Sequence, residues 1–262
     1  MEFNAPKKRF GQNFLHDGNI IGKIVDAVSP QETDHMVEIG PGRGAITEKL
    51  CAASHCVDVV EIDLDLASSL EQQPWATPLE VHRGDALKFD FSTLPRRNEQ
   101  LRLIGNLPYN ISTPLLFHFL DTAHLFADIH VMLQKEVVDR MVAEPGTKQY
   151  GRLSVMLAAR CEVEHLFNIG PNCFIPPPKV DSSFARLTPL EQPLVPDDLY
   201  PAFKRVVTQA FSMRRKTLGN ALKKLISAEA IEATGIDPKL RAEVLSPEQF
   251  LTLAKLSLNT ES

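Results

Sequence analysis

The sequence predicts an α/β fold with a mostly parallel sheet, followed by a small all-α domain. Three observations indicate this. Short apolar segments alternate with helical patterns through the first two-thirds of the 262 residues, several of these segments are apolar on both faces, and only helical patterns occur after about residue 190. Strands that are buried on both faces are typical of a parallel sheet covered by helices on both sides.

Five strands are expected first, at 35–40, 56–63, 78–85, 101–106 and 128–134. Helical periodicity occurs between and after them, at 45–54, 64–73, 112–122 and 135–145. A further helix that begins near residue 154 precedes two strands, which could close the sheet as an antiparallel edge pair.

A proline-rich segment marks the expected domain boundary. Residues 188–201 read "TPLEQPLVPDDLYP" and contain four prolines among acidic residues. Three helical patterns follow, at 200–211, 215–226 and 246–258. We therefore expect residues 1–190 to form the sheet domain and residues 191–262 to form the helical domain.

The composition is that of an ordinary globular protein, with 44% hydrophobic and 23% charged residues. No run of 18 apolar residues is present, so no membrane helix is expected. The N-terminus lacks the apolar core of a secretory signal. The cysteines show neither C-x-x-C pairing nor zinc-ligand spacing, so we expect reduced thiols, no bound metal and a cytoplasmic location.

Charge is unevenly distributed along the chain. The formal net charge is −5, but residues 199–228 contain seven lysines and arginines and no acid, which leaves a net charge of −12 for the remainder. This segregation predicts a cationic face for a polyanion on an otherwise acidic body. A solvated helical face is the alternative.

A glycine-rich turn follows the first expected strand. The sequence "VEIGPGRGAIT" places Gly40, Gly42 and Gly44 before a helix that is expected to begin near Ala45. Glycines let the backbone turn sharply and approach a ligand closely, and a helix N-terminus carries partial positive charge. Such a turn alone is a weak signal, so its neighbours decide the interpretation.

Carboxylates lie at the ends of the next two strands. Glu61, which follows Gly40 by 21 residues, is in position to accept both ribose hydroxyls of an adenosine, and Asp85, after Gly84, is in position to meet the adenine amino group. Glu38 precedes the turn, where a cation or an amino group could be met. These acids favour S-adenosylmethionine over a nicotinamide cofactor, and simple solvation of strand ends is the bland alternative.

A nicotinamide dehydrogenase is a rival interpretation of the same loop. It would need a general acid or base such as histidine on a substrate domain, and the eight histidines show no such placement. His118 and His130 lie in apolar patterns that are typical of core or surface positions. A dehydrogenase should bind NAD and ignore S-adenosylmethionine.

The sequence "NLPY" ends the fourth strand, at the sheet edge where open α/β sheets bind ligands. An amine on an aromatic ring is a poor nucleophile because its lone pair is delocalised. Acceptors that grip its N–H groups can localise the lone pair, and the side-chain oxygen of Asn106 and the carbonyl of Leu107 are such acceptors. Pro108 holds Leu107 extended, and Tyr109 offers a flat face for a base.

Four motifs together closely resemble one family. "KKRFGQNFL", "VEIGPGRGAIT", "NLPYNIS" and "FIPPPKVDSSF" are similar, in this order, to motifs of the small-subunit ribosomal RNA adenine N6-dimethyltransferases. The resemblance covers the chain from about Lys8 to the C-terminal helices, and the four motifs in order are far more specific than any one of them.

The resemblance implies a Rossmann-like S-adenosylmethionine-dependent methyltransferase sheet with a helical C-terminal domain that binds RNA. It implies SN2 transfer of methyl groups to two adjacent adenines in the 3′-terminal hairpin of 16S rRNA, during biogenesis of the small ribosomal subunit. S-adenosylhomocysteine would be the product, and the subunit would be the partner. No metal, membrane or obligate protein partner is expected.

Site residues follow from the resemblance position by position. The expected cofactor contacts are Asn13, Leu15, Gly40, Gly42, Glu61, Asp85 and Asn106. The expected catalytic segment is Asn106, Leu107, Pro108 and Tyr109. Tyr109 would stack on the target adenine, and Phe174 is a candidate for the opposite face, with a plug of the core as the equal alternative.

Basic residues are the expected RNA contacts. In "FSMRRKTLGNALKK", Phe211, Leu218 and Leu222 are expected to pack inward. The cations expected to contact phosphates are Arg214, Arg215, Lys216 and Lys223. Lys7, Lys8 and Arg9 could add an N-terminal clamp over cofactor and base, the alternative being disordered, solubilising charge.

Two further rivals stay open at this point. One is a resistance methylase that acts on large-subunit rRNA and shares the cofactor loop and the NLPY-type motif. The other is a non-catalytic rRNA-binding assembly factor that keeps the fold. The intact Asn106–Tyr109 segment and the intact acids argue against a purely scaffolding role.

Overall fold

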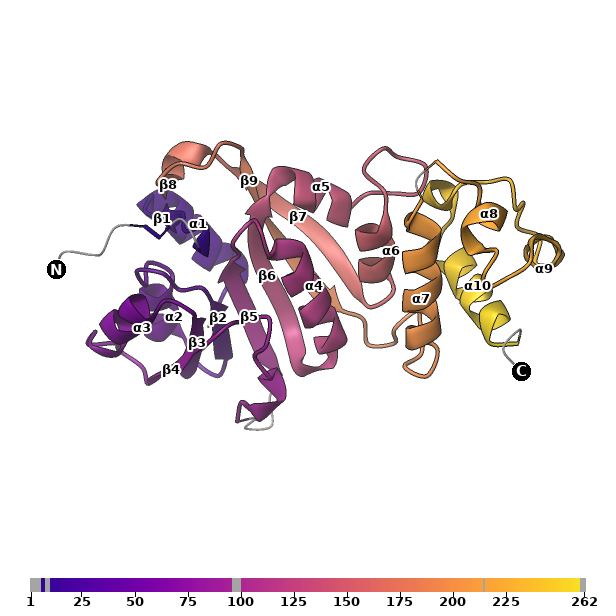
Figure 1. Cartoon of the computed structure of the whole chain (residues 1–262). Helices are drawn as coiled ribbons and strands as arrows, with labels where there is room; N and C mark the ends of the chain where they lie inside the picture. Colours follow the sequence, from indigo (N-terminus) through magenta and orange to yellow (C-terminus); the bar gives the residue numbers. More distant parts are fainter. Residues whose placement is uncertain (1–5, 8–9, 96–99, 214, 260–262) are drawn as a thin grey trace. The chain divides into compact units, whose positions relative to one another are not determined.

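The computed structural model describes residues 6–7, 10–95, 100–213 and 215–259 (Figure 1). The chain packs into two compact units. The sheet unit comprises Met1–Val138 and Glu164–Pro189, and the helical unit comprises Asp139–Val163 and Leu190–Ser262. Residues 139–163 thus pack with the C-terminal helices. The division into domains 1–190 and 191–262 stays a prediction.

The sheet unit is built on a seven-stranded mixed sheet with the order β4-β3-β2-β5-β6-β9-β7. Its strands are β2 (His35–Ile39), β3 (Cys56–Glu61), β4 (Leu79–Arg83), β5 (Leu101–Asn106), β6 (Phe126–Gln134), β7 (Cys161–Ile169) and β9 (Ser182–Pro189). Strands β2 to β6 pair in parallel, and β9 pairs antiparallel with β6. The five expected parallel strands and the antiparallel closure of the sheet are confirmed.

The central strands are buried on both faces, as the apolar runs predicted. Val37 and Val59 are fully buried on neighbouring strands, and Leu103 and Ile104 are fully buried although they point to opposite faces of β5. The helices that cover the sheet are α1 (Gly18–Val28), α2 (Thr47–Ala53), α3 (Leu64–Glu71), α4 (Ser112–Asp121) and α5 (Lys135–Met141). This doubly covered sheet leaves the carboxyl ends of β2, β3 and β5 as the place for a ligand.

Helix α1 was not predicted, although its sequence carries a clear start signal. Asp17 caps the helix because its side chain accepts hydrogen bonds from the backbone N–H groups of Asn19 and Ile20. Ile24 and Val28, four residues apart, are buried. The cap and the apolar spacing both indicate a helix, so this one was predictable.

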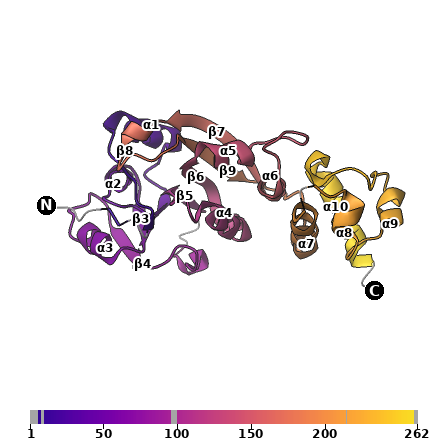
Figure 2. The same ribbon diagram turned by 45° about the horizontal axis from the view of Figure 1, so that its top comes forward.

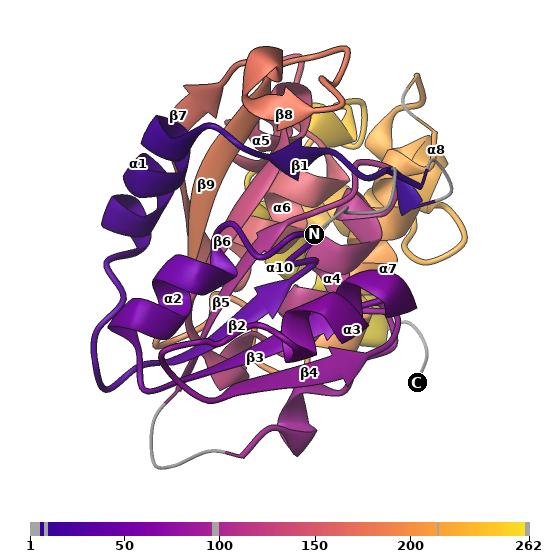
Figure 3. The same ribbon diagram turned by 90° about the vertical axis from the view of Figure 1, so that its left-hand side faces the viewer.

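A second, two-stranded sheet was also missed. Strand β1 (Phe14–Leu15) pairs antiparallel with β8 (Phe174–Ile175), with Leu15 opposite Phe174 (Figure 3). The two strands are far apart in the sequence and each has only two residues. A strand this short has no periodicity to reveal it, so this pairing could not be read from the sequence.

The helical unit contains α6 (Arg152–Ala158), α7 (Tyr200–Phe211), α8 (Leu218–Leu222), α9 (Ala228–Ala233) and α10 (Pro247–Asn259) (Figure 2). Helix α7 packs against α6, α8 and α10. Leu218 and Leu222 are fully buried, and the Phe211 ring lies 5.7 Å from the Phe250 ring. The expectation that these three apolar side chains pack inward is therefore met.

Two general features of the described residues bear on function. Along the ranges described above, no helix combines the length and the apolar character needed to cross a membrane. No disulfide joins the four described cysteines, Cys51, Cys56, Cys161 and Cys173. Burial raises the pKa of Cys51 to about 12 and that of Cys161 to about 12, so these two thiols are poor nucleophiles at neutral pH.

Candidate active site

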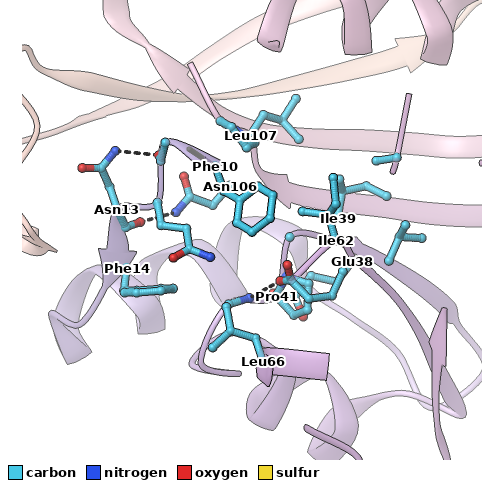
Figure 4. A pocket seen from close by; sticks show the side chains of 18 of the residues that line it. Phe10, Asn13, Phe14, Glu38, Ile39, Pro41, Ile62, Leu66, Asn106 and Leu107 are labelled. Carbon is cyan, nitrogen blue, oxygen red and sulfur yellow. Dashed lines mark hydrogen bonds between the residues drawn. The ribbon is translucent and has the colours of Figure 1, made fainter. Parts of the chain in front are cut away.

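One pocket of about 980 Å³, a volume that includes its open mouth, lies at the carboxyl ends of β2, β3 and β5 (Figure 4). Its lining comes from the N-terminal segment, the glycine-rich turn, and the ends of the strands. Ten residues expected from the sequence line it together: Asn13, Leu15, Gly40, Gly42, Glu61, Asp85, Asn106, Leu107, Pro108 and Tyr109. Residues 13 and 109 thus contribute to the same cavity.

The glycine-rich turn has the backbone conformation that its sequence implied. Gly42 and Gly44 have φ values of +57° and +81°, in the left-handed region that favours glycine. A Cβ at Gly42 would come within 3.0 Å of the Phe14 ring, and one at Gly44 within 2.8 Å of Trp75. Helix α2 begins at Thr47, two residues later than expected, because the turn continues through Ile46.

Glu61 is a buried carboxylate at the tip of β3. Its Oε1 accepts a hydrogen bond of 2.8 Å from the N–H of Asp63, and its Oε2 accepts one of 3.3 Å from the N–H of Gly42. Burial raises the pKa of Glu61, and the backbone donors oppose this rise. Each oxygen keeps a lone pair for a further donor, so this carboxylate fits a pair of ribose hydroxyls.

Glu38 is the second buried acid of the pocket and the one whose proton is most strongly held. Only 3% of the residue is exposed, and its Oε2 accepts a 2.5 Å hydrogen bond from the Thr47 hydroxyl. Burial raises the pKa of Glu38 to about 7, and the nearby Glu61 adds to the rise. Glu38 therefore changes charge near neutral pH.

The turn after β4 supplies a further acid to the pocket. Asp85 lines the pocket, and its Oδ1 accepts a 3.0 Å hydrogen bond from the N–H of Leu87. Ile62 and Leu66, which sequence reasoning did not select, also line the pocket, and Ile62 is 44% exposed. A pocket that combines apolar side chains with an acid suits a flat base that must be both packed and hydrogen-bonded.

Asn106 ends β5 and is held by the N-terminal segment. Its Nδ2 donates a 3.0 Å hydrogen bond to the backbone carbonyl of Asn13 (Figure 4). Leu107 anchors the following turn, because its side chain is buried and its N–H donates to the carbonyl of Met132. Asn106 and Leu107 are therefore fixed on both sides of the peptide that joins them.

Tyr109 is half-buried and is oriented by β9. Its hydroxyl shares a 2.6 Å hydrogen bond with the hydroxyl of Ser182, which is fully buried. Burial raises the pKa of Tyr109, and the bond to Ser182 opposes this rise only in part. The ring is neutral at physiological pH and keeps one orientation at the edge of the pocket.

Phe174, expected from the sequence either at the target base or in the core, is buried. It is 2% exposed, packs in the core cluster with Leu15 and Ile24, and is not among the residues that line the pocket. The pairing of β8 with β1 holds Phe174 opposite Leu15. Its burial agrees with the alternative that Phe174 is a plug of the core, and a role of Phe174 at the target base stays a prediction.

The N-terminal segment supplies contacts that the sequence did not reveal. The Lys7 ammonium lies 2.6 Å from carboxylate oxygens of both Asp63 and Asp65. Gln12 donates from Nε2 to Asp63 Oδ2 at 3.0 Å and accepts from the N–H of Lys7 at 2.7 Å. Asp63 follows Glu61 by two residues, and that spacing is the only sequence signal it has.

The basic residues expected to bind RNA lie in the helical unit. Arg215, Lys216 and Lys223 are exposed. Arg214, Lys8 and Arg9 fall outside the described residues. The exposed cations of the helical unit therefore remain candidates for RNA contact.

The described residues show no side chains grouped as metal ligands. Within residues 6–7, 10–95, 100–213 and 215–259, no group of three His, Cys, Asp or Glu side chains is arranged to hold a metal ion. The expectation that no metal is bound stays a prediction.

Two solved methyltransferase structures are similar to this chain over almost its whole length. A dimethyladenosine transferase from Plasmodium falciparum superposes with a TM-score of 0.79 at 27% identity, over 95% of this chain and 98% of that one. The 23S rRNA methyltransferase ErmE gives a TM-score of 0.68 at 26% identity, over 93% of this chain and 99% of that one. The fold is thus shared with these two methyltransferases.

Sequence comparison extends over almost the whole chain. The chain is 53% identical over 249 residues to "Ribosomal RNA small subunit methyltransferase A" of Pseudomonas syringae pv. tomato, covering 95% of this chain and 93% of the relative. The protein of the same name from Nitrosococcus oceani is 50% identical over 256 residues, covering 97% of each. The family model "Ribosomal RNA adenine dimethylase" matches residues 3–258. The chain therefore belongs to the ribosomal RNA adenine dimethylase family.

Proposed function

We propose that this protein transfers methyl groups from S-adenosylmethionine to the N6 amines of two adjacent adenines in the 3′-terminal hairpin of 16S rRNA. One observation carries the proposal: the segment Asn106–Tyr109 lines the same pocket as the glycine turn and Glu61. A cofactor held by the acids would thus lie beside the acceptors that grip an exocyclic amine. The identity of 50–53% to small-subunit methyltransferases supports the choice of RNA.

The cofactor would be held by the sheet edge. Glu61 would accept the ribose hydroxyls, Asp85 the adenine amine, and the turn at Gly40 would lie against the remainder of the molecule. When bound, S-adenosylmethionine supplies an electrophilic methyl group, and S-adenosylhomocysteine is the product that remains. These residues bind and orient; none of them needs to change its covalent state.

The target amine would be activated without a strong base. The Asn106 side-chain oxygen and the Leu107 carbonyl would each accept one N–H of the amine, which localises its lone pair towards the methyl group. The face of Tyr109 would stack on the adenine and hold it in line. The proton leaves after the attack, when the amine has become strongly acidic.

Recognition of the subunit would be shared with the helical unit. The exposed Arg215, Lys216 and Lys223 would contact phosphates, which gives affinity without sequence information. We place this activity in the cytoplasm, where small subunits are assembled and cysteine thiols stay reduced.

Labelling tests the proposed activity directly. The protein is incubated with tritiated S-adenosylmethionine and undermethylated small or large ribosomal subunits, and the labelled base is mapped. Label on two adjacent adenines near the 3′ end of 16S rRNA is expected. Label on large-subunit rRNA would instead support a 23S rRNA methyltransferase activity like that of ErmE. No label on either subunit would favour a non-catalytic assembly factor.

The RNA-binding role has its own test. Reversal of Arg215, Lys216 and Lys223 to Glu should lower subunit affinity on the order of tenfold or more and flatten its dependence on salt, because fewer phosphates are neutralised. Reversal of the exposed Lys49 on α2 is the control. If the salt dependence of the triple variant is unchanged, these cations do not contact RNA and only form a solvated helical face.

A further inference from the structure

The segment that precedes α1 contacts three separate parts of the pocket. We call residues Lys7 and Phe10–Leu15 the N-terminal strap. Lys7 and Gln12 bind Asp63 beside Glu61. The next residue, Asn13, accepts a hydrogen bond from Asn106, the residue proposed to grip the target amine. The strap therefore joins the cofactor side of the pocket to the target side.

The anchor at Asp63 is well built. Asp63 is 2% exposed, and its Oδ1 accepts from the Lys7 ammonium while its Oδ2 accepts from the amide of Gln12. Burial alone would raise the pKa of Asp63, but the hydrogen bonds from Lys7, Gln12 and the N–H of Asp65, together with the charge of Lys7, lower it. Asp63 also caps α3 through the N–H of Asp65. The Asp63 carboxylate thus holds the strap, and Asp63 is itself held at the start of α3.

The middle of the strap lies tightly against the pocket. The Phe14 ring packs where a Cβ at Gly42 would come within 3.0 Å, and the Arg43 guanidinium stands 4.5 Å from the centre of that ring. Gly11 has a φ of +62°, and a Cβ there would lie 3.2 Å from Asn110 Oδ1. The strap can therefore shift little without disturbing the turn or the NLPYN segment.

The contact at Asn106 determines which way its amide faces. The Asn13 carbonyl can only accept, so the Asn106 nitrogen must point towards it and the Asn106 oxygen must point away (Figure 4). In the reverse orientation two oxygens would face each other, and the amine-binding side would present a donor to a donor. The strap thus selects the orientation in which Asn106 can accept from an amine.

We propose that the N-terminal strap is a positioning element for methyl transfer: Asp63 anchors it through Lys7 and Gln12, and its Asn13 carbonyl turns the Asn106 oxygen towards the target amine. This inference rests on the proposed function of the pocket. It assigns Lys7, Gln12 and Asp63 a role in the rate of transfer, in addition to any role in covering the cofactor.

Loss of the anchor should act on the rate at saturation. In Lys7→Met the strap loses its ion pairs with Asp63 and Asp65, so kcat at saturating cofactor and subunit should fall on the order of tenfold. Lys7→Arg should recover most of the rate, and Lys49→Met, at an exposed lysine of α2, should change nothing. Melting temperatures are measured for all three variants to exclude a loss of stability as the cause. Lys7→Met should melt at the same temperature as wild type.

Two outcomes separate this inference from the proposed function. If the wild-type chain methylates small subunits and Lys7→Met keeps its kcat, with or without a higher KM for the cofactor, the strap is at most a cover and the positioning role is overturned. If the wild-type chain methylates nothing in the same assay, the proposed function fails first.

A second variant tests the amide orientation itself. In Asn106→Asp a carboxylate can accept from the amine but cannot donate to the Asn13 carbonyl, so activity should be lost at pH of about 8. Protonation restores one donor and one acceptor, so activity relative to wild type should rise as pH falls to about 5.5. Wild-type activity at pH 8, or no rise towards acid pH, would overturn the orienting role.

Discussion

The two sides of the pocket are held in different ways. On the proposed cofactor side, two backbone N–H groups fix Glu61. One belongs to Gly42 in the glycine-rich turn, and the other to Asp63, two residues further along the chain. On the target side, Asn106 is fixed by Asn13 and Tyr109 by Ser182, which lie 93 and 73 positions away. The cofactor side is thus a product of the parallel sheet itself, whereas the target side depends on segments that the sheet does not specify.

The largest expected effect is on the target side. Asn106→Ala removes the side-chain acceptor for the amine, so methyl transfer should fall on the order of a thousandfold, since removal of one such electrostatic contact costs about 3–4 kcal/mol. RNA affinity and melting temperature should stay close to wild type. Single-turnover methylation measures the rate, and Asn172→Ala, at an exposed asparagine, is the control. A loss of less than tenfold would remove the argument that Asn106 grips the amine.

The next effect concerns the charge of Glu38. Its folded pKa of about 7 is above the ordinary value of 4.5, so the folded protein keeps a proton that the unfolded chain has released between these pH values. Stability should therefore fall as pH rises from about 4.5 to about 7, by up to about 3 kcal/mol, and stay level above that.

Glu38→Gln isolates this contribution. The amide can still accept from Thr47 but carries no charge, so the variant should melt several degrees above wild type at pH of about 8 and level with it near pH 5. Thermal melts across this range measure the difference. Parallel curves for the two proteins would mean that Glu38 does not hold a proton in the folded state.

Glu61 should show a smaller effect, on affinity rather than on rate. Glu61→Ala removes the acceptor for two ribose hydroxyls, and hydrogen bonds to a charged group contribute about 1.5–3 kcal/mol. S-adenosylmethionine should bind roughly 10- to 100-fold more weakly by calorimetry. Glu48→Ala, at an exposed acid on α2, is the matched control. Equal affinity of Glu61→Ala and wild type would rule out the ribose role.

The smallest effect should come from Ser182. Ser182→Ala frees the Tyr109 hydroxyl, so the ring loses its fixed orientation and the KM for the subunit should rise several-fold, in line with one neutral hydrogen bond of about 1 kcal/mol. Tyr109→Phe should give the same change, and the double variant should add nothing.

Ser183→Ala supplies the control for this experiment. Ser183 is equally buried and bonds Asn168 instead, so its loss should lower stability and leave the KM unchanged. If Ser182→Ala and Ser183→Ala behave alike, the bond to Tyr109 has only a structural role.

The difference between the two sides also explains what the sequence could predict. The parallel strands, the glycine turn and the acids at strand tips were found because local patterns specify them, and α1 was overlooked although Asp17 marked its start. The contacts of Lys7 and Gln12 with Asp63, the bond from Ser182 to Tyr109 and the pairing of β1 with β8 were not found, because each joins distant segments. For Phe174 the sequence left two alternatives, the target base or the core, and the pairing with Leu15 that bears on them has only two residues in each strand.

The bond between Tyr109 and Ser182 has a consequence for the time at which the protein becomes active. Contacts between residues far apart in the sequence form late, because a long loop must lose conformational entropy before the contact stabilises the chain. During synthesis the strands that hold Glu61 and Asn106 leave the ribosome well before β9, and only β9 brings the serine to the tyrosine. A nascent chain would therefore acquire its cofactor site before its target site, and would become competent for RNA only once its sheet has closed.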